Sequence, residues 1–329
     1  MNHSSFRLGN FFVRSHHQRV QVAGNHPTAA TRQALPCPRS AQGHVEAKVC
    51  ARDSLPTANR ILFIAPLSRR VSAPLIAIGI VVLCSVHAAG AVELKVLSGG
   101  AMRAALQELA RTFENASGHK LVIEYSVVAK VMERVADGDP VDVAILTRPP
   151  FDKLVGTGKL VGGTGVPLAH VPIGLAVRAG VPQPDISTVA AWQRALLNAN
   201  IVTYGDPVMG DAAGVHVAHV LETLGLAEVL QPKTRLISPL PGQSGAQYLT
   251  GLFQRGETEI AMAPISVLNE TQGIDIVGLL PSELQSPDLV FLAAIPSTCR
   301  HPAEAKALID FLASASAKTV YQAKGMEPS

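Results

Sequence analysis

The stretch VELKVLSGGAM, residues 92–102, predicts a β-strand that ends in a turn of small residues. Its first half is rich in valine and leucine, which favour strands, and Ser98, Gly99 and Gly100 then supply a turn without bulk. Apolar residues recur at helical spacing from Ala101 to Phe113, so a helix follows at once. A strand, a Ser/Gly turn and a helix N-terminus place free backbone N–H groups at the carboxyl edge of a sheet, which favours anion binding.

The same alternation of strands and helices continues along the chain. Strands are predicted at 121–125, 141–146, 201–204, 259–263 and 274–279, with helices between them and at the C-terminal end. We expect Ser187 to cap the helix that carries Trp192. This order predicts an α/β fold with parallel sheets, whose ligands lie beyond the carboxyl ends of the strands.

Two long apolar segments, 166–177 and 289–295, read as strands that cross between two lobes. The prediction is therefore a pair of Rossmann-like lobes with a ligand cleft between them, joined by two crossover strands. Residues 92–172 and 290–329 form the first lobe, and residues 173–289 form the second.

The N-terminal part differs from the rest in composition and charge. Residues 1–66 carry no sustained periodicity, and we interpret them as disordered or as sequence upstream of the true translation start. Residues 67–91 have a basic start, an apolar run and an Ala-Gly-Ala end, which predicts a secretory signal peptide cleaved after Ala91. A transmembrane anchor is the alternative interpretation of this segment.

Charge and cysteine content limit the partners of the folded part. Residues 1–91 hold 10 Arg and Lys against 2 acidic residues, so residues 92–329 hold 28 − 10 = 18 basic and 25 − 2 = 23 acidic residues, a net charge of −5. This acidic body argues against nucleic acid as a partner. Only Cys299 lies beyond residue 91, so this part forms no internal disulfide, and we interpret Cys299 as a small buried side chain.

Several motifs in order resemble those of periplasmic solute-binding proteins of ABC importers, most of all the molybdate-binding branch. The resemblance covers nearly all of residues 92–329 and rests on the turn at Ser98, the strand-end Ser126, and the runs at 138–143, 205–214 and 256–261. It implies a type II periplasmic binding protein fold, a periplasmic location, no cofactor and no catalysis. It further implies a monomer that captures a small anion, such as molybdate or tungstate, and presents it to a permease in the inner membrane.

The resemblance also implies which residues contact the anion. The expected set is Ser98, Gly99, Gly100, Ser126 and Val127 in the first lobe, and Asp211, Ala212, Ala213, Pro264 and Ser266 in the second. This sequence departs from the family at two of these positions. Asp211 introduces a carboxylate that repels a dianion unless it faces away, and Pro264 stands where relatives have a tyrosine. An organic anion or another oxyanion is therefore an alternative ligand, with Ser266 or Ser244 as the replacement donor, and a metal is a further alternative.

Other functional readings are weaker. Asp142 alternates with apolar residues and is expected to be a buried hydrogen-bond partner. His216 and His219 lie three apart on a helix, but no third ligand accompanies them, so no metal site is predicted. Neither a Gly-x-Ser-x-Gly elbow nor a phosphate-binding loop occurs, which disfavours hydrolase and nucleotide-dependent enzymes. A solute sensor that reports to a membrane receptor remains an alternative to an import component.

Overall fold

The computed structural model describes residues 90–329, all of which fall in one compact unit. The predicted extension 1–66 and the signal peptide 67–91, except its last two residues, lie outside the described residues. So do Cys37, Cys50 and Cys84.

The first sheet has six strands in the order β11-β4-β10-β3-β1-β2. They are β1 (Glu93–Gly99), β2 (Lys120–Ser126), β3 (Val143–Thr147), β4 (Val166–His170), β10 (Val290–Ala294) and β11 (Glu327–Pro328). β1 pairs in parallel with β2 and β3, whereas β10 runs antiparallel to β3 and β4. The predicted parallel pairing is confirmed for β1, β2 and β3. The sheet as a whole is mixed, because a strand returning from the other half enters in the opposite direction.

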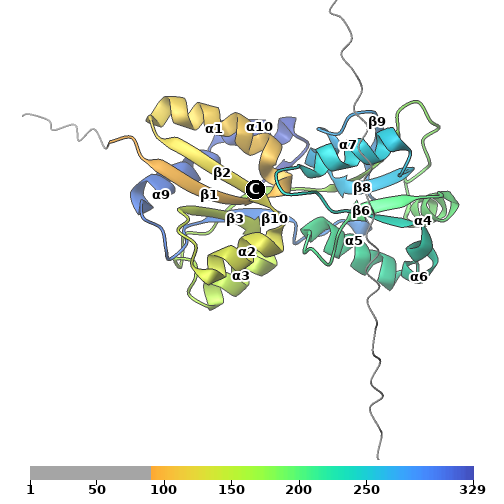
Figure 1. The fold of residues 1–329 in the computed structure, drawn as a ribbon, viewed down its shortest axis with the longest axis horizontal. Coiled ribbons are helices and arrows are strands. Elements are labelled where there is room, and N and C mark those ends of the chain that lie inside the picture. Colours follow the sequence, from red (N-terminus) through yellow and green to blue (C-terminus); the bar gives the residue numbers. More distant parts are fainter. Residues whose placement is uncertain (1–89) are drawn as a thin grey trace, which may run out of the picture. The chain divides into compact units, whose positions relative to one another are not determined.

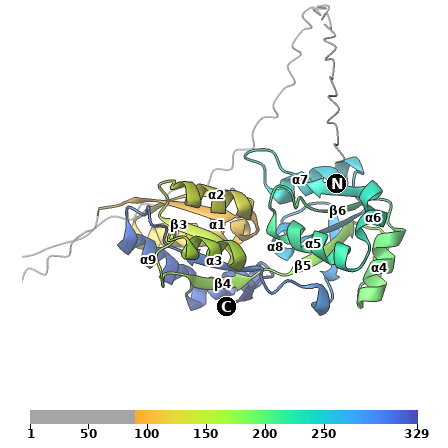
Figure 2. The same cartoon turned by 90° about the horizontal axis from the view of Figure 1, so that it is seen from below.

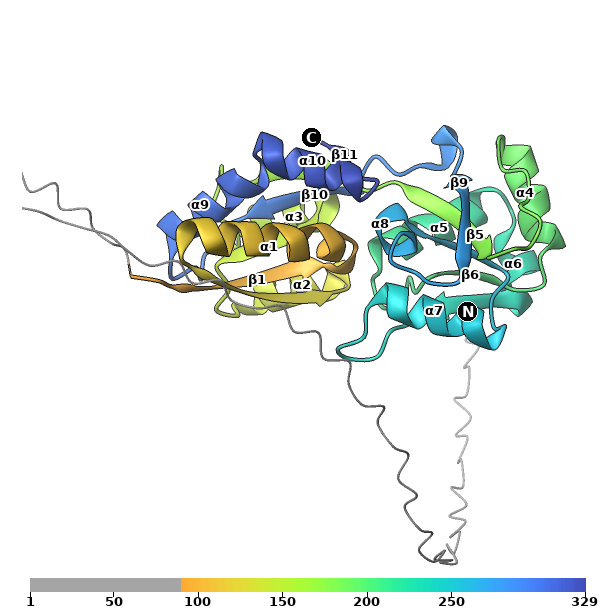
Figure 3. The same cartoon turned by 90° about the horizontal axis from the view of Figure 1, so that it is seen from above.

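Helices cover both faces of this sheet. They are α1 (Arg103–Ser117), α2 (Val128–Asp137), α3 (Arg148–Gly156), α9 (Pro302–Leu312) and α10 (Ala315–Ala323), and the 3₁₀ turn η1 (Gly100–Met102) leads into α1. Figure 3 shows α1, α9 and α10 gathered on one face, and Figure 1 shows α2 and α3 on the other. Apolar side chains such as Leu94, Phe113 and Ile145 fill the core, and we call this sheet with its helices the first lobe.

The second sheet has five strands in the order β7-β6-β8-β5-β9. They are β5 (Ile173–Arg178), β6 (Val202–Gly205), β7 (Thr234–Ile237), β8 (Ile260–Pro264) and β9 (Ile274–Leu279). β6 is parallel to β7 and β8, and β5 is antiparallel to β8 and β9, so this sheet is also mixed. The short strand β7 was not predicted, because its four residues, Thr-Arg-Leu-Ile, do not alternate between polar and apolar.

The helices of this second lobe are α4 (Val189–Asn198), α5 (Ala212–Thr223), α6 (Ala227–Leu230), α7 (Gly245–Arg255) and α8 (Ile265–Leu268), with short 3₁₀ turns η2 (Gln231–Lys233) and η3 (Ser282–Leu284). Figure 1 shows α7 on one side of the sheet and α5 and α6 on the other. Leu175 and Val177 of β5 belong to the core under α4 and α5, whereas Ala176 between them belongs to the core under α7. Period-two alternation thus divides one strand between two layers. Thr188, rather than the predicted Ser187, caps α4.

The α/β fold of two lobes is confirmed, but the chain crosses between them differently from the prediction. The segment predicted as one long strand is split into β4 and β5, which belong to different sheets (Figure 2). The break falls at Val171-Pro172, because a proline has no N–H to continue a ladder. The second predicted crossover strand is β10, which lies within the first sheet. Residues 280–289 make the return connection instead, and the Val171 N–H donates to the Leu289 carbonyl at 3.0 Å, so the two crossings lie side by side.

Three hydrogen bonds join the lobes directly. The Ala129 N–H donates to the Gly210 carbonyl at 3.3 Å, and the Ser266 hydroxyl donates to the Ala101 carbonyl at 2.7 Å. The Asn269 amide donates to the Lys324 carbonyl at 3.1 Å. We call these the inter-lobe contacts. Within the described residues, no single helix has the length and apolar character needed to cross a membrane.

Candidate functional site

A cavity of about 380 Å³ lies between the lobes, and segments from both line it. The first lobe contributes the turns that follow β1 and β2, and the second contributes those that follow β6, β7 and β8. The crossing segments add Val171, Leu289 and, at the start of β10, Phe291. The cavity thus lies beyond the carboxyl ends of parallel strands in both sheets, as the fold class predicts.

On the first-lobe wall, two helices begin at the cavity without a side-chain cap. Gly100 and Ala101 of η1, which leads into α1, line it, and so do Val127 and Val128 at the start of α2. No side chain hydrogen-bonds the N-terminal N–H groups of either helix at its cap position. The start of α1 therefore presents a positive dipole end to the cavity without a side-chain cap. The start of α2 also lacks such a cap, but the Gly210 carbonyl of the second lobe accepts its Ala129 N–H at 3.3 Å. Helix N-termini at a cavity wall favour a negatively charged ligand.

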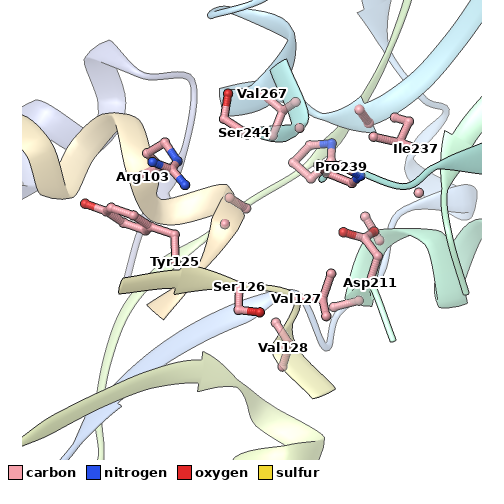
Figure 4. Close-up of a pocket in the computed structure, with 18 of the residues that line it drawn as sticks. Arg103, Tyr125, Ser126, Val127, Val128, Asp211, Ile237, Pro239, Ser244 and Val267 are labelled. Carbon is pink, nitrogen blue, oxygen red and sulfur yellow. The ribbon is translucent and has the colours of Figure 1, made fainter. Parts of the chain in front are cut away.

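Arg103, the first residue of α1, lies on the same wall (Figure 4). Its guanidinium carbon lies 4.2 Å above the ring centroid of Tyr125, a cation–π contact that holds the side chain in place. Among the residues that the structure describes, no carboxylate forms an ion pair with Arg103. The wall therefore carries a fixed cation that is available to a ligand.

Tyr125 keeps its proton at any physiological pH. Burial raises the pKa of its phenol to about 12, although Arg103 works in the opposite direction. Its hydroxyl oxygen is buried and has no hydrogen-bond partner within the described part of the chain. Tyr125 therefore serves as a platform for Arg103 and not as a proton acceptor.

On the second-lobe wall, side chains cap the helix N-termini. Asp211 caps α5, and its Oδ1 accepts the Gly214 N–H at 2.7 Å. Ser244 caps α7 through a capping box, in which its hydroxyl accepts the Gln247 N–H at 3.1 Å and the Gln247 side chain accepts the Ser244 N–H at 2.8 Å. Both N-termini are thus compensated by side chains of their own lobe.

Asp211 is partly buried in this wall and lines the cavity. Burial raises the pKa of its carboxyl above the usual range, the N–H groups of Gly214 and Ala213 lower it, and the nearby Asp206 raises it again. Two glycines make room for it. A Cβ at Gly205 would collide with the Asp211 carboxylate, and a Cβ at Gly214 would collide with the Gly205 carbonyl. Backbone and side chain therefore fit together closely where β6 meets α5.

Apolar side chains complete the cavity, and they leave more space than a tetrahedral oxyanion needs. They come from both lobes and the crossings, namely Val171, Ile237, Leu240, Val267, Leu289 and Phe291. A cavity with one cation, helix N-termini and apolar walls suits an anion with a carbon skeleton.

The structure brings seven of the ten predicted site residues to the cavity. These are Gly100, Ser126, Val127, Asp211, Ala212, Ala213 and Pro264. Ser98 and Gly99 are not among the lining residues: Ser98 is fully buried, and its hydroxyl donates to the Gly99 carbonyl at 3.1 Å. Ser266 is also absent, because its hydroxyl is used in an inter-lobe contact. That any of them binds a ligand stays a prediction.

Sequence reasoning missed three parts of the cavity. Arg103 was not predicted as a site residue, and Tyr125 was taken only as the end of a strand. In the loop 237–245 only Ser244 was named, as a replacement donor, and it does line the cavity. The Pro-Leu-Pro-Gly run before it was not considered, and the Ser-x-x-Gln pattern at Ser244 is the signature of a capping box.

Residues with other possible chemistry have structural roles. Asp142 accepts N–H groups from Lys95 at 2.9 Å and Arg300 at 3.1 Å, which confirms it as a buried hydrogen-bond partner. The His216 ring bonds the Leu284 carbonyl at 2.9 Å. Burial raises the pKa of the Cys299 thiol to about 11. No cluster of potential metal ligands occurs among residues 90–329.

The model of the family described as bacterial extracellular solute-binding protein matches residues 94–327. The chain belongs to this family. The resemblance to periplasmic solute-binding proteins is thereby confirmed, and membership implies a periplasmic location, a small-solute ligand and an ABC permease as partner.

Solved structures agree at the level of the fold. The periplasmic molybdate-binding protein of Azotobacter vinelandii superposes with a TM-score of 0.58 at 20% identity, covering 71% of this chain and 98% of that one. The substrate-binding domain of a putative molybdenum ABC transporter from Clostridium difficile superposes with a TM-score of 0.55 at 18% identity, covering 73% and 100%.

Another protein is more similar in sequence than these two structures are. A protein named aconitate isomerase, from Pseudomonas sp, is 32% identical over 264 residues, which cover 78% of this chain and 96% of that protein. The family is one of solute-binding proteins, whereas the name of this relative is that of an enzyme.

Proposed function

We propose that this protein binds a small organic polycarboxylate between its lobes. The observation that carries the proposal is Arg103, a cation fixed over Tyr125 and facing a largely apolar cavity without an acidic partner in the described residues. A guanidinium can bind a carboxylate with two parallel hydrogen bonds, and the N-termini of α1 and α2 lie beside it.

The chemistry of the cavity wall favours an organic polycarboxylate over molybdate or tungstate. Inorganic oxyanions are bound by converging polar donors, whereas here Pro264 offers none and apolar side chains occupy much of the wall. The relative named for aconitate, a compound with three carboxylates, supports the same choice. In this function the chain closes on its ligand and presents it to a permease, or to a receptor if it acts as a sensor.

A ligand screen on the purified protein tests the proposal. Calorimetry against cis- and trans-aconitate, citrate, succinate, molybdate, tungstate and sulfate should give binding to polycarboxylates only. A ligand present at 100 times its Kd adds about 2.7 kcal/mol to stability, so thermal shifts offer an independent readout. Binding of molybdate or tungstate without any carboxylate would reject the proposal and restore the inorganic ligand.

Catalysis is the second candidate function, and the isomerase name of the relative favours it. Conversion between the cis and trans forms of an unsaturated polycarboxylate needs no cofactor, because a proton moved from one carbon to another shifts the double bond. A group that moves such a proton must lie in the cavity within reach of the ligand.

A further inference from the structure

Three titratable side chains line the cavity: Arg103, Tyr125 and Asp211. Arginine stays protonated in proteins and cannot accept a proton. The phenol of Tyr125 has a pKa of about 12, so it does not accept one either. This elimination leaves Asp211 as the candidate for proton transfer within the cavity.

The geometry places Asp211 suitably for that role. Figure 4 shows it across the cavity from Arg103, so a ligand whose carboxylate binds the guanidinium extends toward the Asp211 carboxyl. Oδ1 is held by the Gly214 N–H, which fixes the orientation of the group. No side chain in the described part of the chain hydrogen-bonds this carboxyl.

We infer that Asp211 is a catalytic residue that moves a proton along the carbon skeleton of a bound unsaturated polycarboxylate. This inference rests on the proposed polycarboxylate ligand and adds a reaction to it.

The reaction balances within the ligand and this one side chain. The carboxylate of Asp211 takes a proton from the CH₂ group beside the C=C bond, and the C–H electron pair forms a new C=C bond to the neighbouring carbon. The electrons of the old double bond move to its far carbon, where the negative charge is shared with the attached carboxylate. Asp211 then returns the proton to that far carbon, and the new double bond can have the other geometry.

The residues around the cavity favour both the removal of the proton and the charge that then forms on the ligand. Arg103 and the dipoles of α1 and α2 stabilise the charge that develops on the ligand carboxylate. Burial and Asp206 both raise the pKa of the Asp211 carboxyl, which makes it a stronger base than an exposed aspartate. Among groups facing it, Asp206 lies on its own loop, and Arg103 and Tyr125 lie across the cavity.

The test uses the purified protein with cis- or trans-aconitate in D₂O, followed by proton NMR. The wild type should interconvert the isomers, and deuterium should enter the ligand to the extent that the proton on Asp211 exchanges with solvent before it is returned. Asp211→Asn should lower both rates at least about 100-fold, because general acid–base catalysis contributes about 10²–10⁴. Calorimetry should show that this variant still binds, since asparagine caps a helix as well as aspartate does.

A pH profile separates this role from a structural one. Asp206→Asn removes a neighbouring charge that raises the pKa of Asp211, so the acidic limb of the rate profile should move to lower pH. If the wild type binds aconitate but neither isomerises it nor exchanges deuterium, the inference fails and the binding proposal stands. The inference also fails if Asp211→Asn keeps the wild-type rate of isomerisation. It fails likewise if the acidic limb of the pH–rate profile does not move in Asp206→Asn. If no polycarboxylate binds, both proposals fall.

Discussion

On the first-lobe wall of the cavity α1 and α2 begin without a side-chain cap, whereas on the second-lobe wall Asp211 and Ser244 cap α5 and α7. The same local element, a helix N-terminus after a strand, thus lacks a side-chain cap in one lobe and has one in the other. The difference indicates a division of labour, in which the first lobe supplies positive potential and the second supplies shape and a group that titrates.

Removing the charge of Arg103 from the first-lobe wall should have the largest effect on ligand binding. Arg103→Gln should weaken polycarboxylate binding about 10- to 100-fold, since a charge-assisted hydrogen bond contributes about 1.5–3 kcal/mol. The melting temperature without ligand should stay close to that of the wild type. Titration calorimetry measures the first effect and a thermal melt the second.

Arg111→Gln is the matched control, because Arg111 is an exposed residue of the same helix. Equal losses of affinity in both variants would mean that net charge, and not the position of Arg103, attracts the ligand.

Buried Asp142 and half-buried Asp211 offer a second comparison. Burial acts to raise the pKa of the Asp142 carboxyl, but N–H groups of Lys95 and Arg300, the Cys299 thiol and His301 outweigh it and hold this pKa below its usual range. A lowered pKa in the folded state means stability that is present above the unfolded pKa and is lost as pH falls through the folded pKa.

Asp142→Asn should therefore lower the free energy of unfolding by about 1.5 kcal/mol at pH 7, and the difference from wild type should shrink in acid. Asp211→Asn should show no such loss at pH 7, because the Asp211 pKa is shifted upward and burial of its charge disfavours folding. Urea titrations from pH 7 down to about pH 3 measure the free energy of unfolding of both variants. If this free energy changes with pH in the same way for both, the opposite pKa shifts of Asp142 and Asp211 are contradicted.

The smallest expected effect concerns Ser244, which caps α7 on the second-lobe wall. Ser244→Ala should cost about 1 kcal/mol of stability by removing a helix cap, while affinity stays within about threefold of wild type. Ser314→Ala removes the cap of α10 away from the cavity and should cost a similar amount. If Ser244→Ala weakens binding by more than tenfold, the Ser244 hydroxyl donates to the ligand and the second lobe contributes to recognition directly.

The fold could be predicted from sequence because alternation of strands and helices depends on local periodicity, which the residues carry themselves. The break at Pro172 was missed because the apolar run continues through it, and only the lost ladder hydrogen bond reveals the change of sheet. For the cavity, the strand-end position pointed to Ser126, and the resemblance to solute-binding proteins pointed to Asp211. Arg103 could not be predicted, because its position depends on stacking with Tyr125, a residue of a neighbouring element.

The inter-lobe contacts bear on how fast the protein can respond to its solute. Ala129 with Gly210, and Ser266 with Ala101, hold the lobes together through the chain's own groups, so these bonds can form whether or not the cavity is filled. Each hydrogen bond contributes about 0.5–1.5 kcal/mol, so we expect the empty protein to spend part of its time closed, and a solute can then enter only when the lobes separate. The inter-lobe contacts should therefore slow the dissociation of a bound solute, and they should slow its association as well.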